Sequence, residues 1–352
     1  MTAKNPKRRR IEAIDLFCGA GGLSHGLAEA GVKVVAGIDL DPACAHPFEA
    51  NHPGARFIAS DVAEVTGKQL ADLWSTDSVR LLAGCAPCQP FSSYARGKAA
   101  DHDKWGMLFE FARLVKDSLP ELVTMENVPG LAKEAPFAKF RSVLKECGYE
   151  IAFGVLNAAD FGVPQHRKRL VLVASRIGPV AMPEPTHAGP EEWVSVRAAV
   201  GNLPPLTDGQ SDSRDALHRA AKLSPLNQKR VRASVPGGTW RDWPENLVAE
   251  CHRKDSGRHS AGVYGRMEWD RPAPTMTTLC NGYGNGRFGH PEQHRAITLR
   301  EAAIFQSFPP DYEFVPEGQV VPAKTVARLI GNAVPPKLGA AVGRALRLAS
   351  EV

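Results

Sequence analysis

A strand, a glycine-rich turn, a helix and a second strand follow one another near the start of the chain. Residues 11–17 form an apolar run, Gly19-Ala-Gly21-Gly22 makes the turn, residues 23–30 are helical in pattern, and residues 32–38 form a second apolar run that ends at Asp39. Such a βαβ unit is typical of a parallel α/β sheet whose turn glycines let the backbone approach a ligand closely. The spacing is not Gly-x-Gly-x-x-Gly, so it favours a nucleoside-bearing ligand such as S-adenosylmethionine over a dinucleotide. Asp39 would bind the ribose hydroxyls.

Composition limits the class of protein. With 352 residues and 43% hydrophobic content, the chain can bury the core of one large domain or of two moderate ones. Its net charge of +5 is compatible with a polyanionic partner. We find no apolar stretch near the ~20 residues that span a membrane, no signal-peptide core and no secreted disulfide pattern, so we expect a soluble protein of the cytoplasm. A solvated tail, or secondly an arm that touches phosphate, is expected at the basic start, Lys4, Lys7, Arg8, Arg9 and Arg10.

Three interpretations compete for Cys88. The apolar run 79–83 predicts a buried strand, and Cys88 follows it in a turn-rich stretch, where open α/β sheets bind ligands. A buried structural cysteine is the commonest fate of a free thiol. The spacing Cys85-Ala-Pro-Cys88 also fits half a zinc site or a redox pair, although the seven cysteines include no second Cys-x-x-Cys. The third interpretation is that Cys88 is a thiolate nucleophile. The sequence assigns no role to Cys85.

Several polar residues lie at the ends of further predicted strands. Asp61 follows a short strand and could bond an adenine amino group, or could be a turn aspartate. Glu126 follows the strand 121–125 and could hold a proton in an apolar setting, or could be an exposed loop carboxylate. Arg167 and Arg169 alternate before another strand and could face one anionic ligand, or could form a basic surface edge.

Taken together, these stretches resemble the cytosine-5 DNA methyltransferase family of bacterial type. The resemblance covers residues 11 to about 345 and rests on six motifs in the family's order. They are Asp15-Leu-Phe-Cys-Gly-Ala-Gly-Gly22, Gly84-Cys-Ala-Pro-Cys-Gln-Pro-Phe-Ser92, Glu126-Asn-Val128, Gln165-His-Arg-Lys-Arg169, Arg271-Pro-Ala-Pro-Thr-Met-Thr-Thr278 and Gly331-Asn-Ala-Val-Pro-Pro336. Each motif alone is weak, but six in order leave little room for coincidence.

The resemblance implies a fold and a set of functional residues. The fold is α/β, a Rossmann-like S-adenosylmethionine-dependent methyltransferase sheet with helices on both faces, plus a smaller irregular target-recognition domain. S-adenosylmethionine is the implied methyl donor, with no metal, and its implied binding residues are Phe17, Gly19, Gly21, Gly22, Asp39, Asp61, Pro87, Leu108 and Asn332. Cys88 resembles the nucleophile, Glu126 the residue that contacts the cytosine ring nitrogen, and Arg167 and Arg169 its supporting cations.

The second half of the chain is irregular. Frequent prolines exclude long helices between 177 and 270, so we expect a small separate domain there. The expected boundaries are 1–176 with 322–352 for the catalytic domain and 177–321 for the small domain, whose target-recognition region is about 185–265. Residues 256–266 are polar and glycine-rich and are expected to read base edges. Phosphate contacts are expected from Arg219, Lys222, Lys229, Arg230 and Arg232, whereas Trp240 and Trp243 are expected to pack.

Double-stranded DNA is the expected partner of a monomeric enzyme, with a restriction endonuclease or other defence proteins as further partners. Two alternatives remain. One is a methyltransferase that modifies cytosine in transfer RNA. The other is a non-catalytic DNA-bound regulator with this fold, which would be expected to lack Cys88 or Glu126, and both are present.

Overall fold

The computed structural model describes residues 9–87, 106–255 and 262–350. The chain divides into two compact units. The first contains residues up to Asn157, Lys168–Pro185 and the end of the chain from Val334, and the second contains Ala158–Arg167 and Thr186–Ala333. This grouping differs from the expected boundaries because it places 158–167 and 322–333 with the second unit and 177–185 with the first. No helix in the described residues is long and apolar enough to span a membrane.

A seven-stranded sheet organises the first unit, in the order β3-β2-β1-β4-β5-β7-β6. Five strands are parallel to one another, and β7 runs antiparallel to both of its neighbours, β5 and β6. The strands are β1 (Ile11–Leu16), β2 (Lys33–Asp39), β3 (Arg56–Ala59), β4 (Val79–Gly84), β5 (Leu122–Asn127), β6 (Glu150–Asn157) and β7 (Lys168–Ser175). The order changes direction between β1 and β4, so ligand-binding loops are expected at the carboxyl ends of these two strands.

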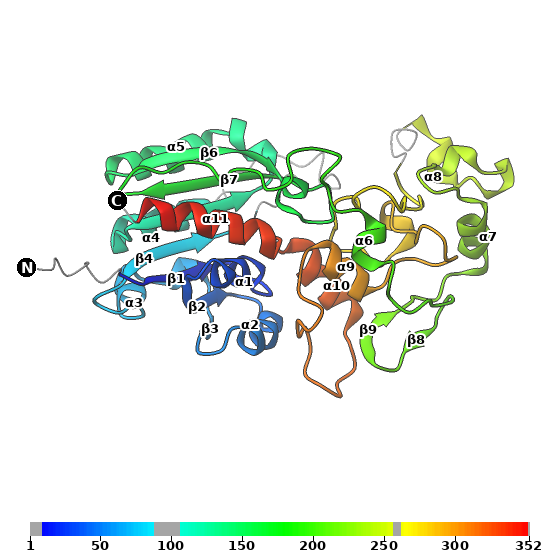
Figure 1. Cartoon of the computed structure of the whole chain (residues 1–352), viewed down its shortest axis with the longest axis horizontal. Coiled ribbons are helices and arrows are strands. Elements are labelled where there is room, and N and C mark those ends of the chain that lie inside the picture. The colour runs from blue at the N-terminus through cyan, green and yellow to red at the C-terminus, as the bar shows by residue number, and fades with distance from the viewer. Residues whose placement is uncertain (1–8, 88–105, 256–261, 351–352) are drawn as a thin grey trace, which may run out of the picture. The chain divides into compact units, whose positions relative to one another are not determined.

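Helices cover both faces of this sheet (Figure 1). Alternate side chains of the strands face one core, shared with α3 (Gly67–Ala71), α4 (Gly106–Ser118) and α5 (Ala135–Glu146). The other face is covered by α1 (Gly22–Glu29) and α11 (Pro336–Ala349), which pack side by side. The last helix of the chain thus packs back onto the first part of the chain. Another helix of this unit, α2 (Ala45–Asn51), places Phe48 against Gly37 of β2.

The second unit has little regular structure. Its described residues contain the hairpin β8 (Ser211–Asp212) and β9 (Asp215–Arg219) and five short α-helices, α6 (Val196–Val200), α7 (Pro225–Ala233), α8 (Glu250–Arg253), α9 (Leu299–Phe305) and α10 (Ala323–Asn332). A capping box opens α9, with Thr298 and Glu301 as its two residues.

Buried arginines replace regular hydrogen bonding in the core of this unit. Irregular backbone leaves carbonyl oxygens that no helix or strand satisfies, and an arginine offers five donors for them. Arg266, for example, donates to the carbonyls of Val231, Ser234, His290 and Gln293. Backbone carbonyls are also bonded by the buried Arg167, Arg230 and Arg295, whereas the buried Arg300 bonds the carboxylate of Asp215.

Candidate active site

The glycine turn follows β1 and has an unusual backbone. Phe17, Gly19 and Gly21 all have positive φ, at 56°, 55° and 85°. For Phe17 such a φ is costly, and residues held this way cluster at functional sites. A Cβ added to Gly19 would meet no atom within 4 Å, so the turn faces open space there. Gly21 then caps α1, which begins at Gly22.

Asp39, the last residue of β2, holds the turn in place. One carboxylate oxygen accepts the amide of Gly19 at 2.9 Å, and the other accepts the amide of Asp41 at 2.9 Å. Each oxygen has room for a second donor, so the two ribose hydroxyls of a nucleoside could bind here together with the backbone amides. The residues present therefore fit a nucleoside-bearing donor. Leu40, which follows Asp39 and is 68% exposed, is a candidate apolar contact for its base; the sequence analysis missed this residue.

Asp15, two residues before Phe17, was not assigned a role from the sequence. Its side chain is buried and accepts the Ser24 hydroxyl of α1 at 2.7 Å. Burial raises the pKa of Asp15 to about 7, and the nearby carboxylate of Asp39 acts in the same direction, while the Ser24 hydrogen bond opposes it. This acid belongs to the framework that supports the turn.

The remaining donor-binding candidates have diverse surroundings. Asp61 is half-buried and caps a short helix by accepting the amide of Ala63 at 2.9 Å, as a turn aspartate would. Pro87 is exposed at the edge of the described residues. Leu108 lies on α4 and is buried in the main core, in agreement with the periodicity of that helix. Asn332 is the last residue of α10 and is exposed in the second unit.

Glu126 lies inside β5, one residue before its end, rather than after the strand as expected. It is 5% exposed, so it is not a loop carboxylate. Its oxygen Oε1 lies 3.0 Å from Nε of Arg169 on β7, and its oxygen Oε2 lies 2.9 Å from Sγ of Cys85. The thiol contact was not expected from the sequence. Cys88, the expected nucleophile, lies outside the described residues.

Arg167 and Arg169 have different partners. Arg169 pairs with Glu126 in the first unit. Arg167 is 2% exposed and donates to three carbonyls of the second unit, those of Met276, Gly331 and Ala333, at 3.0–3.1 Å. Within its own unit, Arg167 therefore holds together segments that are distant in sequence.

Comparison with known proteins decides the family. Residues 11–347 match the family model of the C-5 cytosine-specific DNA methylase. A Type II methylase of Herpetosiphon aurantiacus, M.HgiDII, is 48% identical over 337 residues, which cover 95% of this chain and 94% of the relative. The chain belongs to the C-5 cytosine-specific DNA methylase family. The resemblance found in the sequence is thereby confirmed.

A further relative and two solved structures agree with this family assignment. M.Eco47II of Escherichia coli, a Type II methyltransferase, is 33% identical and matches 95% of this chain and 78% of its own length. Among solved structures, a prophage-encoded protein of E. coli superposes with a TM-score of 0.75 at 22% identity and covers 97% of this chain and all of its own. The Dnmt2 methyltransferase of S. pombe gives 0.63 at 20% identity, covering 97% of this chain and 99% of its own. These two structures confirm the methyltransferase fold.

Family membership establishes the reaction. The chain is a DNA cytosine-5 methyltransferase, which transfers a methyl group to carbon 5 of cytosine in DNA. Enzymes of this family use S-adenosylmethionine as the donor. No group of three or more potential metal ligands occurs in the described parts of the chain.

The candidate DNA-binding residues of this methylase divide by exposure. Arg219, Lys222, Lys229 and Arg232 are exposed in the second unit and remain candidates for phosphate contacts. The expectation for Arg230 was wrong. It is 8% exposed, donates to the Leu247 carbonyl and lies over the rings of Trp243 and Tyr264, because it fills a core that has few aliphatic side chains.

The segment 256–266, expected to read base edges, is only partly described, since residues 256–261 lie outside the described part. Of the rest, Arg266 is 5% exposed and bonded to backbone carbonyls, so it is not available to a DNA base. Tyr264 packs edge-on against the rings of Trp243 and Tyr283. The expectation that this segment contacts base edges is therefore wrong for Arg266.

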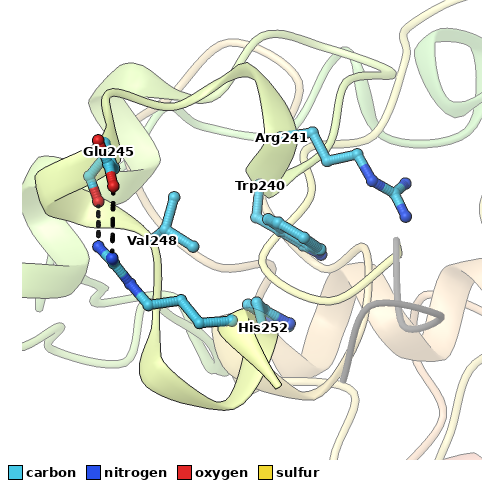
Figure 2. A pocket seen from close by; sticks show the side chains of 6 residues that line it. Trp240, Arg241, Glu245, Val248 and His252 are labelled. Carbon is cyan, nitrogen blue, oxygen red and sulfur yellow. Dashed lines mark hydrogen bonds and ion pairs between the residues drawn. The ribbon is translucent and has the colours of Figure 1, made fainter. Parts of the chain in front are cut away.

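A hollow of about 510 Å³ lies in the region expected to recognise the target (Figure 2). Trp240 and His252 stack on one another, with ring centres 4.5 Å apart and planes 5° from parallel, and the guanidinium of Arg241 lies 5.0 Å from the centre of the Trp240 ring. Glu245 lies on the opposite side of the hollow and pairs with Arg253 at 3.5 Å. Trp240 and Trp243 are both buried, so the expectation that they pack is confirmed.

Proposed function

We propose that this methylase modifies cytosine within one specific sequence of double-stranded DNA, as the modification enzyme of a Type II restriction–modification system. The relatives that are 48% and 33% identical carry Type II names, which supports that assignment. A cognate restriction endonuclease would then be the partner in the cell, and the enzyme would act as a monomer on DNA in the cytoplasm. A cytosine stacked in a duplex must be flipped out to reach a catalytic residue.

One observation carries the catalytic assignment. The buried carboxylate of Glu126 is held by Arg169 at the end of β5, and the neighbouring parallel strand β4 runs directly into the stretch that contains Cys88. A carboxylate near the end of one strand and a thiol four residues beyond the end of the adjacent parallel strand could act on one base. Cys88 is therefore the proposed nucleophile and Glu126 the group that contacts the cytosine ring nitrogen.

The chemistry explains why both groups are needed. Carbon 5 of cytosine is too weak a nucleophile to take a methyl group, but addition of the Cys88 thiolate to carbon 6 makes carbon 5 enamine-like. Glu126, with Arg169 beside it, shares a proton with ring nitrogen 3 and so drains the negative charge that this addition places on the ring. Carbon 5 then takes the methyl group from the sulfonium of the donor, which leaves as S-adenosylhomocysteine. Finally the proton on carbon 5 is lost to water, the shared proton returns to Glu126, and the bond between carbon 6 and the Cys88 sulfur breaks to regenerate the thiolate.

The methyl donor is proposed to bind at the glycine turn. Asp39 would accept the ribose hydroxyls, while Phe17, Gly19, Gly21 and Gly22 would shape the surface that the donor contacts. Asp61, Pro87, Leu108 and Asn332 complete the proposed set, and Arg167 is proposed to act as a structural support of the site. The donor supplies an electrophilic methyl group, and no metal is proposed.

The test is methyl transfer by the purified protein with a labelled donor and either unmethylated duplex DNA or transfer RNA. We expect label in DNA and not in RNA, and we expect Cys88→Ser to abolish transfer while donor binding by calorimetry is unchanged. DNA with 5-fluorocytosine cannot lose a proton from carbon 5, so wild-type enzyme should remain attached to it on a denaturing gel.

Cys251→Ser is the control, since it removes an exposed thiol of the second unit and should leave transfer intact. Full activity of Cys88→Ser would refute the assignment of Cys88 as the nucleophile. Label in RNA alone would refute the assignment of DNA as the substrate. Bisulfite sequencing of DNA from a host that expresses the enzyme would reveal whether one sequence is modified.

A further inference from the structure

The thiol of Cys85 occupies a defined position beside the catalytic carboxylate. Cys85 directly follows β4, and its amide donates to the carbonyl of Leu16 on β1 at 3.4 Å. The carbonyl of the next residue, Ala86, accepts the side-chain amide of Asn127 at 2.9 Å. Two hydrogen bonds to neighbouring strands thus hold the backbone around Cys85.

Strand register brings this thiol to Glu126. The parallel strands β4 and β5 pair Gly84 with Met125, so the residues that follow, Cys85 and Glu126, are neighbours across the sheet. Sγ lies 2.9 Å from Oε2, which is a hydrogen-bonding distance, and the thiol donates to this oxygen.

Both oxygens of the carboxylate therefore have a polar neighbour. Arg169 forms an ion pair at Oε1 and the Cys85 thiol donates a hydrogen bond to Oε2, and these two contacts restrict the rotation of the carboxylate about its terminal bond. Oε2 has a second lone pair, so it can contact a base while it still accepts the thiol. A cysteine that served only to fill space would have no need to direct its S–H group at this oxygen.

We propose that Cys85 is a positioning residue for methyl transfer, whose thiol holds Glu126 in the orientation that contacts the cytosine ring nitrogen. This inference rests on the proposed role of Glu126. It assigns Cys85 no covalent step. A correctly oriented carboxylate matters because a small misplacement of a catalytic group slows the chemical step while substrate binding is retained.

The experiment compares four variants with wild type in methyl transfer to unmethylated duplex DNA. Cys85→Ala removes the donor, Cys85→Val removes it while retaining side-chain volume, and Cys85→Ser keeps a donor. Cys147→Ala is the matched control, because Cys147 is another half-buried thiol of the first unit, located at the end of α5.

The expected result is a lower kcat without a change in KM. Loss of one hydrogen bond to a charged group should lower kcat by about tenfold in both Cys85→Ala and Cys85→Val. KM for DNA and for the donor should not change. Cys85→Ser should restore kcat to within about threefold of wild type, and Cys147→Ala should match wild type.

The possible failures can be told apart. A wild-type kcat in Cys85→Ala or Cys85→Val overturns the inference, and so does a kcat in Cys85→Ser that is as low as in Cys85→Ala. Glu126→Gln is measured in parallel. If it retains full activity, the proposed function has failed at Glu126; if it is inactive while Cys85→Ala is fully active, only the role of Cys85 is wrong.

Discussion

Asp15, which supports the glycine turn, has an unusually high pKa. Asp15 is buried with one hydroxyl donor, that of Ser24, and its pKa is raised to about 7. In the unfolded chain an aspartate titrates near pH 4. Between about pH 4 and 7, therefore, the folded protein holds a proton that the unfolded chain has lost. The contribution of Asp15 to stability is fully present below pH 4 and is lost as the pH rises through 7.

Asp15→Asn should remove this pH dependence, because asparagine resembles the protonated acid in shape and does not titrate. The unfolding free energy of the variant minus that of wild type should rise by up to about 1.4 kcal/mol per pH unit between pH 5 and 7, then level off. Urea unfolding of both proteins from pH 5 to 8 measures this difference. Asp72→Asn, which changes an exposed carboxylate at the end of α3, should follow wild type. A constant difference for Asp15→Asn would show that this carboxyl is already ionised at pH 5.

At the scale of residues, the sequence predicted which side chains are functional candidates better than it predicted which residues they contact. Motif order identified Asp39, Glu126 and Arg169 as candidates, and the structure gives Glu126 and Arg169 a direct ion pair. The bond from Cys85 to Glu126 was missed because it depends on the register of two parallel strands. The burial of Arg230 was missed for a related reason, since a helical arginine is normally solvated and only the surrounding aromatic rings make a buried position favourable.

At the scale of elements, the contact between α1 and α11 depends on glycine. A Cβ on Gly26 would lie 2.1 Å from the Pro336 carbonyl oxygen and 2.5 Å from the Ala340 amide. On α11, a Cβ on Gly343 would lie 2.6 Å from that of Ala30. The two helix backbones can approach this closely only because neither position has a side chain. Since α1 begins at the glycine turn, this packing also fixes the orientation of the turn.

Gly26→Ala should therefore destabilise the protein, although alanine is the better helix former. The clash involves backbone atoms that cannot rotate away, and overpacking of this kind costs about 1–3 kcal/mol. Urea unfolding measures the change. Gly106→Ala is the control, because a Cβ at this first position of α4 would meet no atom within 4 Å, and it should be neutral or slightly stabilising. Equal stability of the two variants would mean that the helices do not pack this closely in solution.

Strong apolar patterns predicted most elements of the first unit. The predicted strands at 11–17, 32–38, 79–83 and 121–125 correspond to β1, β2, β4 and β5. β6 was not predicted, because it is an edge strand whose side chains are only partly buried and which therefore has a weak apolar pattern. α5 was not predicted either. The reversed direction of β7 is a property of the sheet that no local pattern encodes.

At the scale of the whole molecule, the second unit is more tightly integrated than the sequence indicated. The expected target-recognition region, about 185–265, is connected by many side chains to residues that follow it. Ser234 bonds the hydroxyl of Tyr283 at 2.8 Å, and Arg300 pairs with Asp215 at 2.5 Å. Val231 packs in one cluster with Tyr283 and Ala296. A boundary at 265 would cut through this core.

The last prediction concerns the transfer of target choice between relatives. We expect a hybrid that takes 186–333 from a relative with another target sequence to fold and to methylate the relative's site, since most core residues of the second unit then come from one protein. Arg167 should tolerate the exchange because its bonds to Met276, Gly331 and Ala333 go to backbone carbonyls. A hybrid that exchanges 185–265 alone should be unstable, because Arg266 and Tyr283 of this chain would face foreign partners. Bisulfite sequencing and thermal unfolding measure the two outcomes. If the 186–333 hybrid is active at the original site, the target is chosen by residues outside 186–333, since only those residues are then unchanged.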